Sequence, residues 1–106
     1  MAIYKLKPSI KEMIWGGHKL FNWNKQCNLD NIGETWELST HPSGVCTLED
    51  GTPLTEILTK KMVGPKSSKF AFFPMLIKLI DTNDNLSVQV HPSDDYALEH
   101  ENSLGK

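Results

Sequence analysis

The amino-acid sequence predicts a mainly β protein, an all-β sandwich or jelly roll with one inserted helix. Two segments, 35–40 and 86–90, alternate between two kinds of side chain, and a period of two is typical of a strand. A third segment, 75–80, is apolar on both faces apart from Lys78, which favours a central strand. The turn residues 82–85 would fold this central strand back onto 86–90 as an antiparallel pair.

Two shorter strands and a turn are expected in the first half of the chain. Residues 2–6 and 45–48 have the composition of short strands. The paired glycines of Trp15-Gly16-Gly17 mark a turn, because glycine is the residue that most often interrupts regular structure.

Helix signals occur at two places. Thr52-Pro53 predicts a helix start, with Thr52 as N-cap and Pro53 at the first helical position. Apolar residues with helical spacing follow, and Gly64-Pro65 ends this inserted helix. Ser93 is expected to cap a second, short helix that continues through His100.

Length and composition narrow the class of protein. The chain has 106 residues, 39% hydrophobic and 23% charged, which is the composition of one soluble globular domain. A net charge of −2 argues against a nucleic-acid groove, and no apolar run is long enough to span a bilayer. The first residues lack the apolar core of a signal peptide, so a cytoplasmic location is expected. Cys27 and Cys46 lack metal-ligand spacing and are predicted to be reduced.

The segment that points most directly to function is Leu86 to Pro92. In an extended chain Ser87, Gln89 and His91 would lie on one face, opposite three aliphatic side chains, and Pro92 would end the strand. A polar row that ends in an imidazole is one half of a metal or substrate site. The alternative is that His91 caps a strand end and Gln89 faces solvent.

The same segment resembles the zinc-binding strand of the type I phosphomannose isomerases, a family of the cupin superfamily. Four further segments resemble motifs of that family, in the same order along the chain. They are Met13-Ile14-Trp15-Gly16-Gly17 together with the Gly-Glu-x-Trp-Glu block at 33–42, the strand Phe73 to Asp81, and the closing Leu104-Gly105-Lys106. Several motifs in the correct order identify the family far better than one.

The resemblance implies a cupin jelly roll that is incomplete within this chain, with residues 1–106 as the single N-terminal part of a cupin-type isomerase catalytic domain. The implied reaction interconverts mannose 6-phosphate and fructose 6-phosphate through a zinc-stabilised cis-enediol. We expect the isolated chain to be inactive and, with unpaired strand edges and exposed apolar surface, to self-associate. The alternative is a non-catalytic cupin module that binds sugars or serves as a structural partner.

The resemblance also implies roles for individual residues. Gln89 and His91 would bind Zn²⁺, with two further ligands that do not occur in the matching positions of this chain. Trp15, Lys78 and Ser87 would contact the phosphorylated hexose.

The roles of these substrate-contacting residues have structural alternatives. Trp15 could instead be a core aromatic residue, Lys78 an edge lysine that reaches solvent, and Ser87 a cross-strand hydrogen-bonding group. Lys106 is the candidate catalytic residue, although the sequence does not identify the general base.

Overall fold

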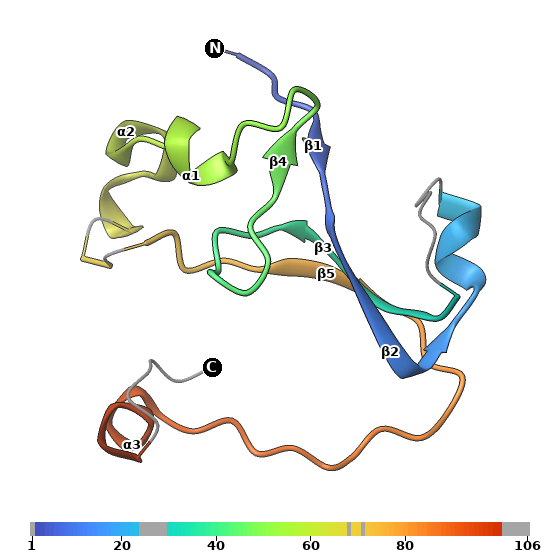
Figure 1. Ribbon diagram of the computed structural model, residues 1–106. Coiled ribbons are helices and arrows are strands. Elements are labelled where there is room, and N and C mark those ends of the chain that lie inside the picture. The colour runs from blue at the N-terminus through green and yellow to red at the C-terminus, as the bar shows by residue number, and fades with distance from the viewer. Residues whose placement is uncertain (1, 24–29, 68, 71, 101–106) are drawn as a thin grey trace.

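The structure is a computed structural model that describes residues 2–23, 30–67, 69–70 and 72–100. Its described part is mainly β, as predicted, with two antiparallel sheets (Figure 1). One sheet pairs β1 (Leu6–Lys7) with β4 (Thr47–Leu48), and the other has the strand order β2 (Ser9–Gly17), β3 (Ile32–Leu38), β5 (Ile77–Ile80). The helical elements are η1 (Lys19–Trp23), α1 (Leu54–Ile57), α2 (Lys60–Val63), η2 (Pro65–Ser67) and α3 (Asp94–His100).

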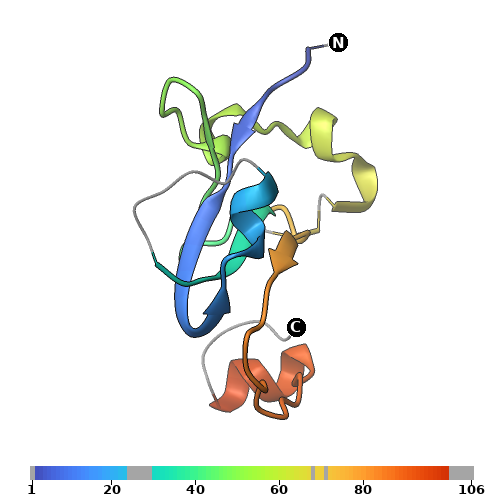
Figure 2. The same ribbon diagram turned by 90° about the vertical axis from the view of Figure 1, so that its right-hand side faces the viewer.

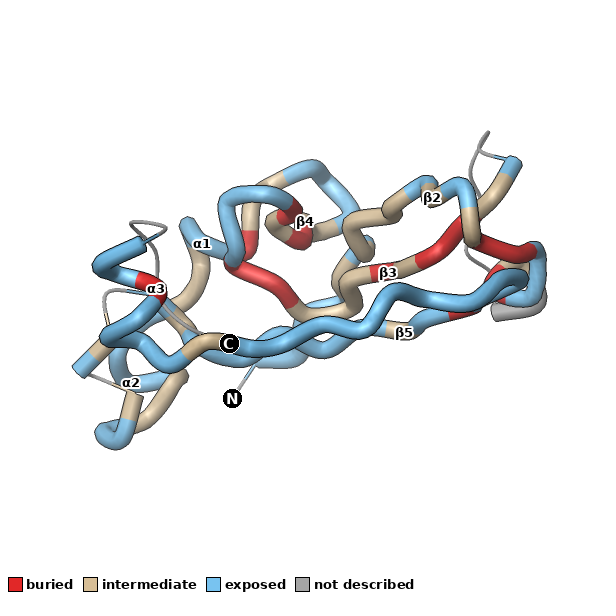
Figure 3. The backbone as a smooth tube through the Cα atoms, turned by 90° about the horizontal axis from the view of Figure 1, so that it is seen from below, coloured by how far each residue is buried: buried red, intermediate tan, exposed pale blue. Residues whose placement is uncertain are grey.

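The fold is flat and open. Its principal extents are 39 × 38 × 17 Å and its radius of gyration is 15.6 Å, whereas a compact domain of about 100 residues has a radius of gyration of about 13 Å. Buried residues lie on β3, at the end of β2 and in the segment 39–46, whereas residues 82–91 and 93–96, beyond β5, are all exposed (Figure 3). The chain therefore buries less of its surface than a complete globular domain of this size.

The centre of the buried region is unusually polar. Thr35, Ser39 and Cys46 are fully buried beside Ile32. Each polar group there has a partner: the Thr35 hydroxyl donates to Glu37, the Ser39 hydroxyl accepts the His41 amide, and the Cys46 thiol donates to the Trp36 carbonyl. Thr35 on β3 and Ser39 just after it are thus more buried than Trp36 and Leu38 between them, and these local hydrogen bonds replace those that water would make.

The predicted turn at Gly16-Gly17 is wrong, because both glycines lie within β2 and are buried. A Cβ atom at Gly16 would lie 2.5 Å from the Gly33 nitrogen, and one at Gly17 would lie 2.5 Å from an Asp81 carboxylate oxygen. The glycines therefore allow β2 to approach β3 and the end of β5 closely. They are needed for this close contact, not for a reversal of the chain.

The predicted hairpin of 75–80 with 86–90 is also wrong. The first segment forms β5 only at Ile77–Ile80, and β5 is the edge strand of its sheet, not a central one. Residues 86–90 form no strand in the described structure; Figures 1 and 2 show them leaving the sheet towards α3 at the lower end of the molecule. Val88 and Val90 are 99% and 89% exposed. Alternation alone does not make a strand, because a strand also needs a partner for its backbone hydrogen bonds.

The inserted helix occurs as two short helices, which corrects the single helix predicted from Thr52. Pro53, not Thr52, is the N-cap of α1, and it makes no side-chain cap. Leu58 and Thr59 are extended and break the helix, and the Thr59 side chain accepts the Met62 amide to begin α2. Gly64 ends α2 with a φ of 82°, as the sequence predicted.

The short C-terminal helix is confirmed as α3, and the Ser93 hydroxyl accepts the Tyr96 amide at its start. Within the described ranges, the helices fall short of the length and apolar character that crossing a bilayer requires.

Candidate functional site

One predicted site residue, Lys78, lies in a hydrogen-bonded cluster on the three-stranded sheet. Its ammonium group is 3.3 Å from Glu34 Oε1, and Trp36 Nε1 donates to Glu34 Oε2 at 2.8 Å. Glu34 and Trp36 are two residues apart on β3 and so share a face, and Trp36 lies directly opposite Lys78 on β5. Both oxygens of one carboxylate are therefore occupied by donors from two adjacent strands.

The exposure of this cluster suits ligand contact. The Glu34 side chain is 14% exposed and the Lys78 side chain 36% exposed, so the carboxylate is largely covered while the ammonium group reaches the surface. On β2, Lys11 is paired with Glu34 of β3, and the Lys11 Nζ is 4.5 Å from the centre of the Trp36 ring. The Lys11 ammonium group also donates to the Ser43 carbonyl. The indole is thus held between two strands.

Trp15 lies on β2, against Gly33 of β3. A Cβ atom at Gly33, the residue before Glu34, would be 2.8 Å from Trp15 Cη2, so the indole edge lies against the Gly33 backbone. The Trp15 carbonyl accepts the Asn83 amide at 2.8 Å. Half-buried Trp15 is therefore held between the Gly33 backbone and the segment after β5.

Buried Asp81 strengthens the same corner of the sheet. Its carboxylate accepts the Lys19 amide at 2.8 Å, and its own amide donates to the Gly33 carbonyl at 2.9 Å. These bonds tie Asp81, the residue after β5, to β3 and to the start of η1. The position of Trp15 thus depends on the hydrogen bonds that Asp81 makes to Lys19 and Gly33 and on the one that Asn83 makes to Trp15.

Ser87, Gln89 and His91 are all exposed and lie on the segment that leaves the sheet. Within the ranges that the structure describes, no group of three or more His, Cys, Asp or Glu side chains is placed to hold a metal ion. The chemistry of the donors nevertheless fits a metal: imidazole is a common zinc ligand and an amide oxygen is a neutral hard donor. Two residues supply at most half of a tetrahedral ligand set, so further donors must come from elsewhere.

Two residues named from the sequence, Lys106 and Cys27, lie outside the described residues. Cys46 is a free thiol in the core, and burial raises the pKa of that thiol above its ordinary value. A buried thiol with a raised pKa is unreactive, which agrees with a structural role for Cys46.

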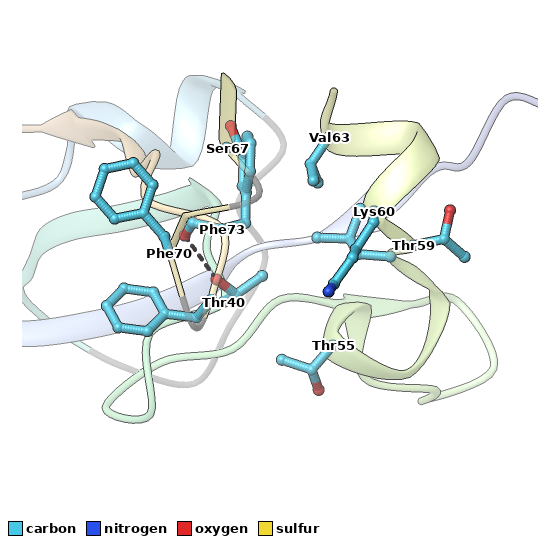
Figure 4. A pocket seen from close by; sticks show the side chains of 10 residues that line it. Thr40, Thr55, Thr59, Lys60, Val63, Ser67, Phe70 and Phe73 are labelled. Atoms are coloured by element: carbon cyan, nitrogen blue, oxygen red, sulfur yellow. Dashed lines mark hydrogen bonds between the residues drawn. The ribbon is translucent and has the colours of Figure 1, made fainter. Parts of the chain in front are cut away.

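A cavity of about 230 Å³ lies at a different place, between the two short helices and the segment before β5 (Figure 4). The Thr40 hydroxyl, in its wall, donates to the Phe73 carbonyl at 3.0 Å. The other lining side chains come from Thr55, Leu58, Thr59, Lys60, Val63, Ser67, Phe70 and Phe72. Among the predicted site residues that the structure describes, none lines this cavity.

Glu34, which lies in the Gly-Glu-x-Trp-Glu block, is the functional candidate to which sequence reasoning assigned no role. A Glu-x-Trp spacing within a strand places both side chains on one face, and this signal was available. The link from Glu34 to Lys78 was not available, because it depends on the register between β3 and β5, which lie more than forty residues apart in sequence.

Comparisons with known proteins give the family. Residues 3–103 match the family model for "Phosphomannose isomerase type I, catalytic domain". The chain is 41% identical over 109 residues to mannose-6-phosphate isomerase of Streptococcus mutans and 41% identical over 108 residues to the probable mannose-6-phosphate isomerase GmuF of Bacillus subtilis. Each alignment covers 95% of this chain but 34% of the relative, so the chain spans about a third of the length of the curated relatives it matches.

A solved structure agrees with these sequence matches. The crystal structure of mannose 6-phosphate isomerase from Bacillus subtilis superposes with a TM-score of 0.78 at 33% sequence identity, over 94% of this chain and 34% of that chain. The predicted fold class, a mainly β cupin-type fold, is thereby confirmed. With a family match over nearly its whole length, this chain belongs to the catalytic-domain family of the type I phosphomannose isomerases.

Proposed function

We propose that this chain forms the N-terminal part of the catalytic domain of a mannose-6-phosphate isomerase. The observation that carries the proposal is the family match over residues 3–103 together with a superposition on one third of a solved mannose 6-phosphate isomerase. The open shape of the chain supports it, since a flat fold with exposed Val88 and Val90 offers surface for further strands.

The proposed reaction moves two protons and needs no external oxidant or reductant. In open-chain mannose 6-phosphate, a base removes the proton on C2 while the O1 carbonyl gains a proton, which gives a cis-enediol. Return of a proton to C1 and loss of the O2 proton give fructose 6-phosphate. The general base is unassigned, and Lys106 stays a candidate on resemblance alone.

Three groups of this chain would act on the substrate. The Lys78 ammonium group reaches the surface and would donate a hydrogen bond to a substrate oxygen. The Trp15 indole would cover an apolar face of the sugar and exclude water. Ser87, exposed on the segment after β5, would donate its hydroxyl to the phosphate group.

A divalent metal, zinc by family resemblance, would be held by the Gln89 oxygen and a His91 ring nitrogen with donors from the remainder of the protein. When bound, such a metal supplies positive charge beside the substrate oxygens on which negative charge develops. The part played by this chain is to present a neutral amide and an imidazole, which leave more net positive charge at the metal than carboxylates would.

The experiment uses an extended protein, in which this chain is followed by the downstream two thirds of the Bacillus subtilis isomerase. We expect the extended protein to convert mannose 6-phosphate to fructose 6-phosphate, and the 106-residue chain alone to be inactive. His91→Ala in the extended protein should abolish turnover, with His18→Ala as the control. A folded extended protein that binds the sugar phosphate without turning it over would contradict the proposal and favour a sugar-binding module.

A further inference from the structure

The Lys78–Glu34 pair has a consequence for substrate recognition. A lysine beside a sugar-phosphate site would ordinarily be assigned to the phosphate, because an ammonium group is a compact positive charge. Here Glu34 Oε1 lies 3.3 Å from that charge, and the Glu34 side chain is only 14% exposed. The two groups together carry no net formal charge, so Lys78 has little attraction left for a dianion.

The Glu34 carboxylate is itself held in place. Trp36 Nε1 donates to Oε2 at 2.8 Å, which leaves Oε1 for Lys78. The indole that provides this N–H is fixed in turn, since Lys11 lies 4.5 Å over its ring and also donates to the Ser43 carbonyl. Lys11 on β2 therefore holds Trp36 on β3, Trp36 holds Glu34 on the same strand, and Glu34 holds Lys78 on β5.

We propose that Glu34 is a positioning residue, which orients Lys78 as a hydrogen-bond donor to the sugar hydroxyl or carbonyl oxygens and keeps it from serving as the phosphate-binding group. This inference rests on the proposed function and extends it, because it assigns Lys78 to the uncharged end of the substrate. The phosphate must then be bound by other groups.

The chain offers a matched control. Lys5 and Glu49 form another lysine–glutamate pair at 3.2 Å, but their side chains are 83% and 62% exposed. Glu49→Gln changes the net charge by the same amount as Glu34→Gln and leaves the Lys78 cluster intact. Any effect specific to Glu34 therefore comes from its contacts and not from overall charge.

The first test measures Lys78 directly in the 106-residue chain by NMR of lysine ammonium groups, with inorganic phosphate as the probe. In the wild-type chain and in Glu49→Gln, we expect a slowly exchanging Lys78 ammonium signal that phosphate hardly shifts. In Glu34→Gln the signal should be lost to exchange, and the Lys78 Cε resonance should respond to phosphate about tenfold more strongly. In Trp36→Phe, the response of the Lys78 Cε resonance to phosphate should lie between those of wild type and Glu34→Gln. A Lys78 that responds to phosphate equally in wild type and Glu34→Gln would overturn the inference.

The second test separates positioning from mere stabilisation in the extended protein. Lys78→Met should lower kcat by about 100-fold, as loss of one oriented donor commonly does, while the Kd for inorganic phosphate changes by less than about twofold. Glu34→Gln should lower kcat by about tenfold, with recovery in Glu34→Asp where the carboxylate still reaches Lys78. A Kd for phosphate at least tenfold weaker in Lys78→Met would overturn the inference. If the extended protein lacks turnover altogether, the proposed function fails, while the NMR and phosphate results still decide the role of Glu34.

Discussion

Substitution of Gly16 by alanine tests the closest approach between strands in the fold. A Cβ atom at this position would lie 2.5 Å from the Gly33 nitrogen and 2.6 Å from the Ile32 carbonyl carbon. Ordinary contact begins at 3.4 Å, so β2 and β3 would have to separate by nearly one ångström. Because both obstructing atoms belong to the backbone, no side-chain rotation can relieve the clash.

The expected loss is at the upper end of the range for overpacked sites, about 3 kcal/mol. For a domain near 100 residues, each 1 kcal/mol lowers the melting temperature by about 4–8 °C, so Gly16→Ala should melt about 12–24 °C below wild type. The measurement is thermal unfolding followed by circular dichroism, with urea unfolding as a second estimate of the free energy.

Ile14→Ala is the control, because Ile14 lies in the same strand but is 96% exposed. Its free energy of unfolding should change by less than about 0.5 kcal/mol. If Gly16→Ala were as stable as Ile14→Ala, the close strand approach and the explanation of the glycine pair would both be refuted.

Three other predictions test different parts of the structure. Asp81→Ala should lower the free energy of unfolding in a urea titration by about 1.5–3 kcal/mol, because the Lys19 amide loses a charged acceptor. Asp81→Asn keeps an acceptor oxygen, so its free energy of unfolding should fall by less. If both variants were as stable as wild type, this role of Asp81 would be contradicted. Val88→Thr with Val90→Thr should change the stability of the 106-residue chain by less than about 0.5 kcal/mol and reduce its self-association in sedimentation, whereas an unchanged association state would argue against this surface. Burial raises the pKa of the Cys46 thiol, so folding favours the protonated form; its stabilising effect is complete below the ordinary pKa of 9.0 and is lost as the pH rises through the raised value. Unfolding titrations that rise from pH 9.0 should therefore show a steeper loss of stability in wild type than in Cys46→Ala. Identical slopes for the two proteins would count against the raised pKa of the thiol.

Local signals in the sequence were sufficient where a structure depends on neighbouring residues. The Ser93 hydroxyl caps α3 and Gly64 ends α2, and both roles follow from side-chain or backbone properties of a single residue. Thr59 is a similar N-cap, but it lies inside a run of helical periodicity. The pattern of apolar residues alone therefore suggested one continuous helix.

Features that depend on distant partners could not be predicted in this way. The alternation at 86–90 is compatible with a strand, yet within the described structure no neighbouring strand pairs with it. The glycine pair is equally compatible with a turn and with a close approach, and only the position of β3 distinguishes them. The Glu34–Lys78 contact likewise depends on cross-strand register.

In the candidate site, too, local sequence signals identified some features, and features that depend on distant partners could not be predicted. Lys78 was identified from the cost of placing a charge in a buried apolar strand, but β5 is an exposed edge strand, where the Lys78 ammonium group reaches solvent and also pairs with Glu34. The metal-ligand prediction for Gln89 and His91 stays a prediction, since both side chains are exposed and lie away from the three-stranded sheet.

X-ray absorption at the zinc edge, on the extended protein loaded with one equivalent of Zn²⁺, addresses the metal-ligand assignment most directly. We predict imidazole scattering with a nitrogen at about 2.0–2.1 Å from the metal, and a clear loss of that scattering in His91→Ala but not in His18→Ala. An absorption spectrum that is the same with and without the His91 imidazole would mean that this chain does not bind the metal in the proposed manner.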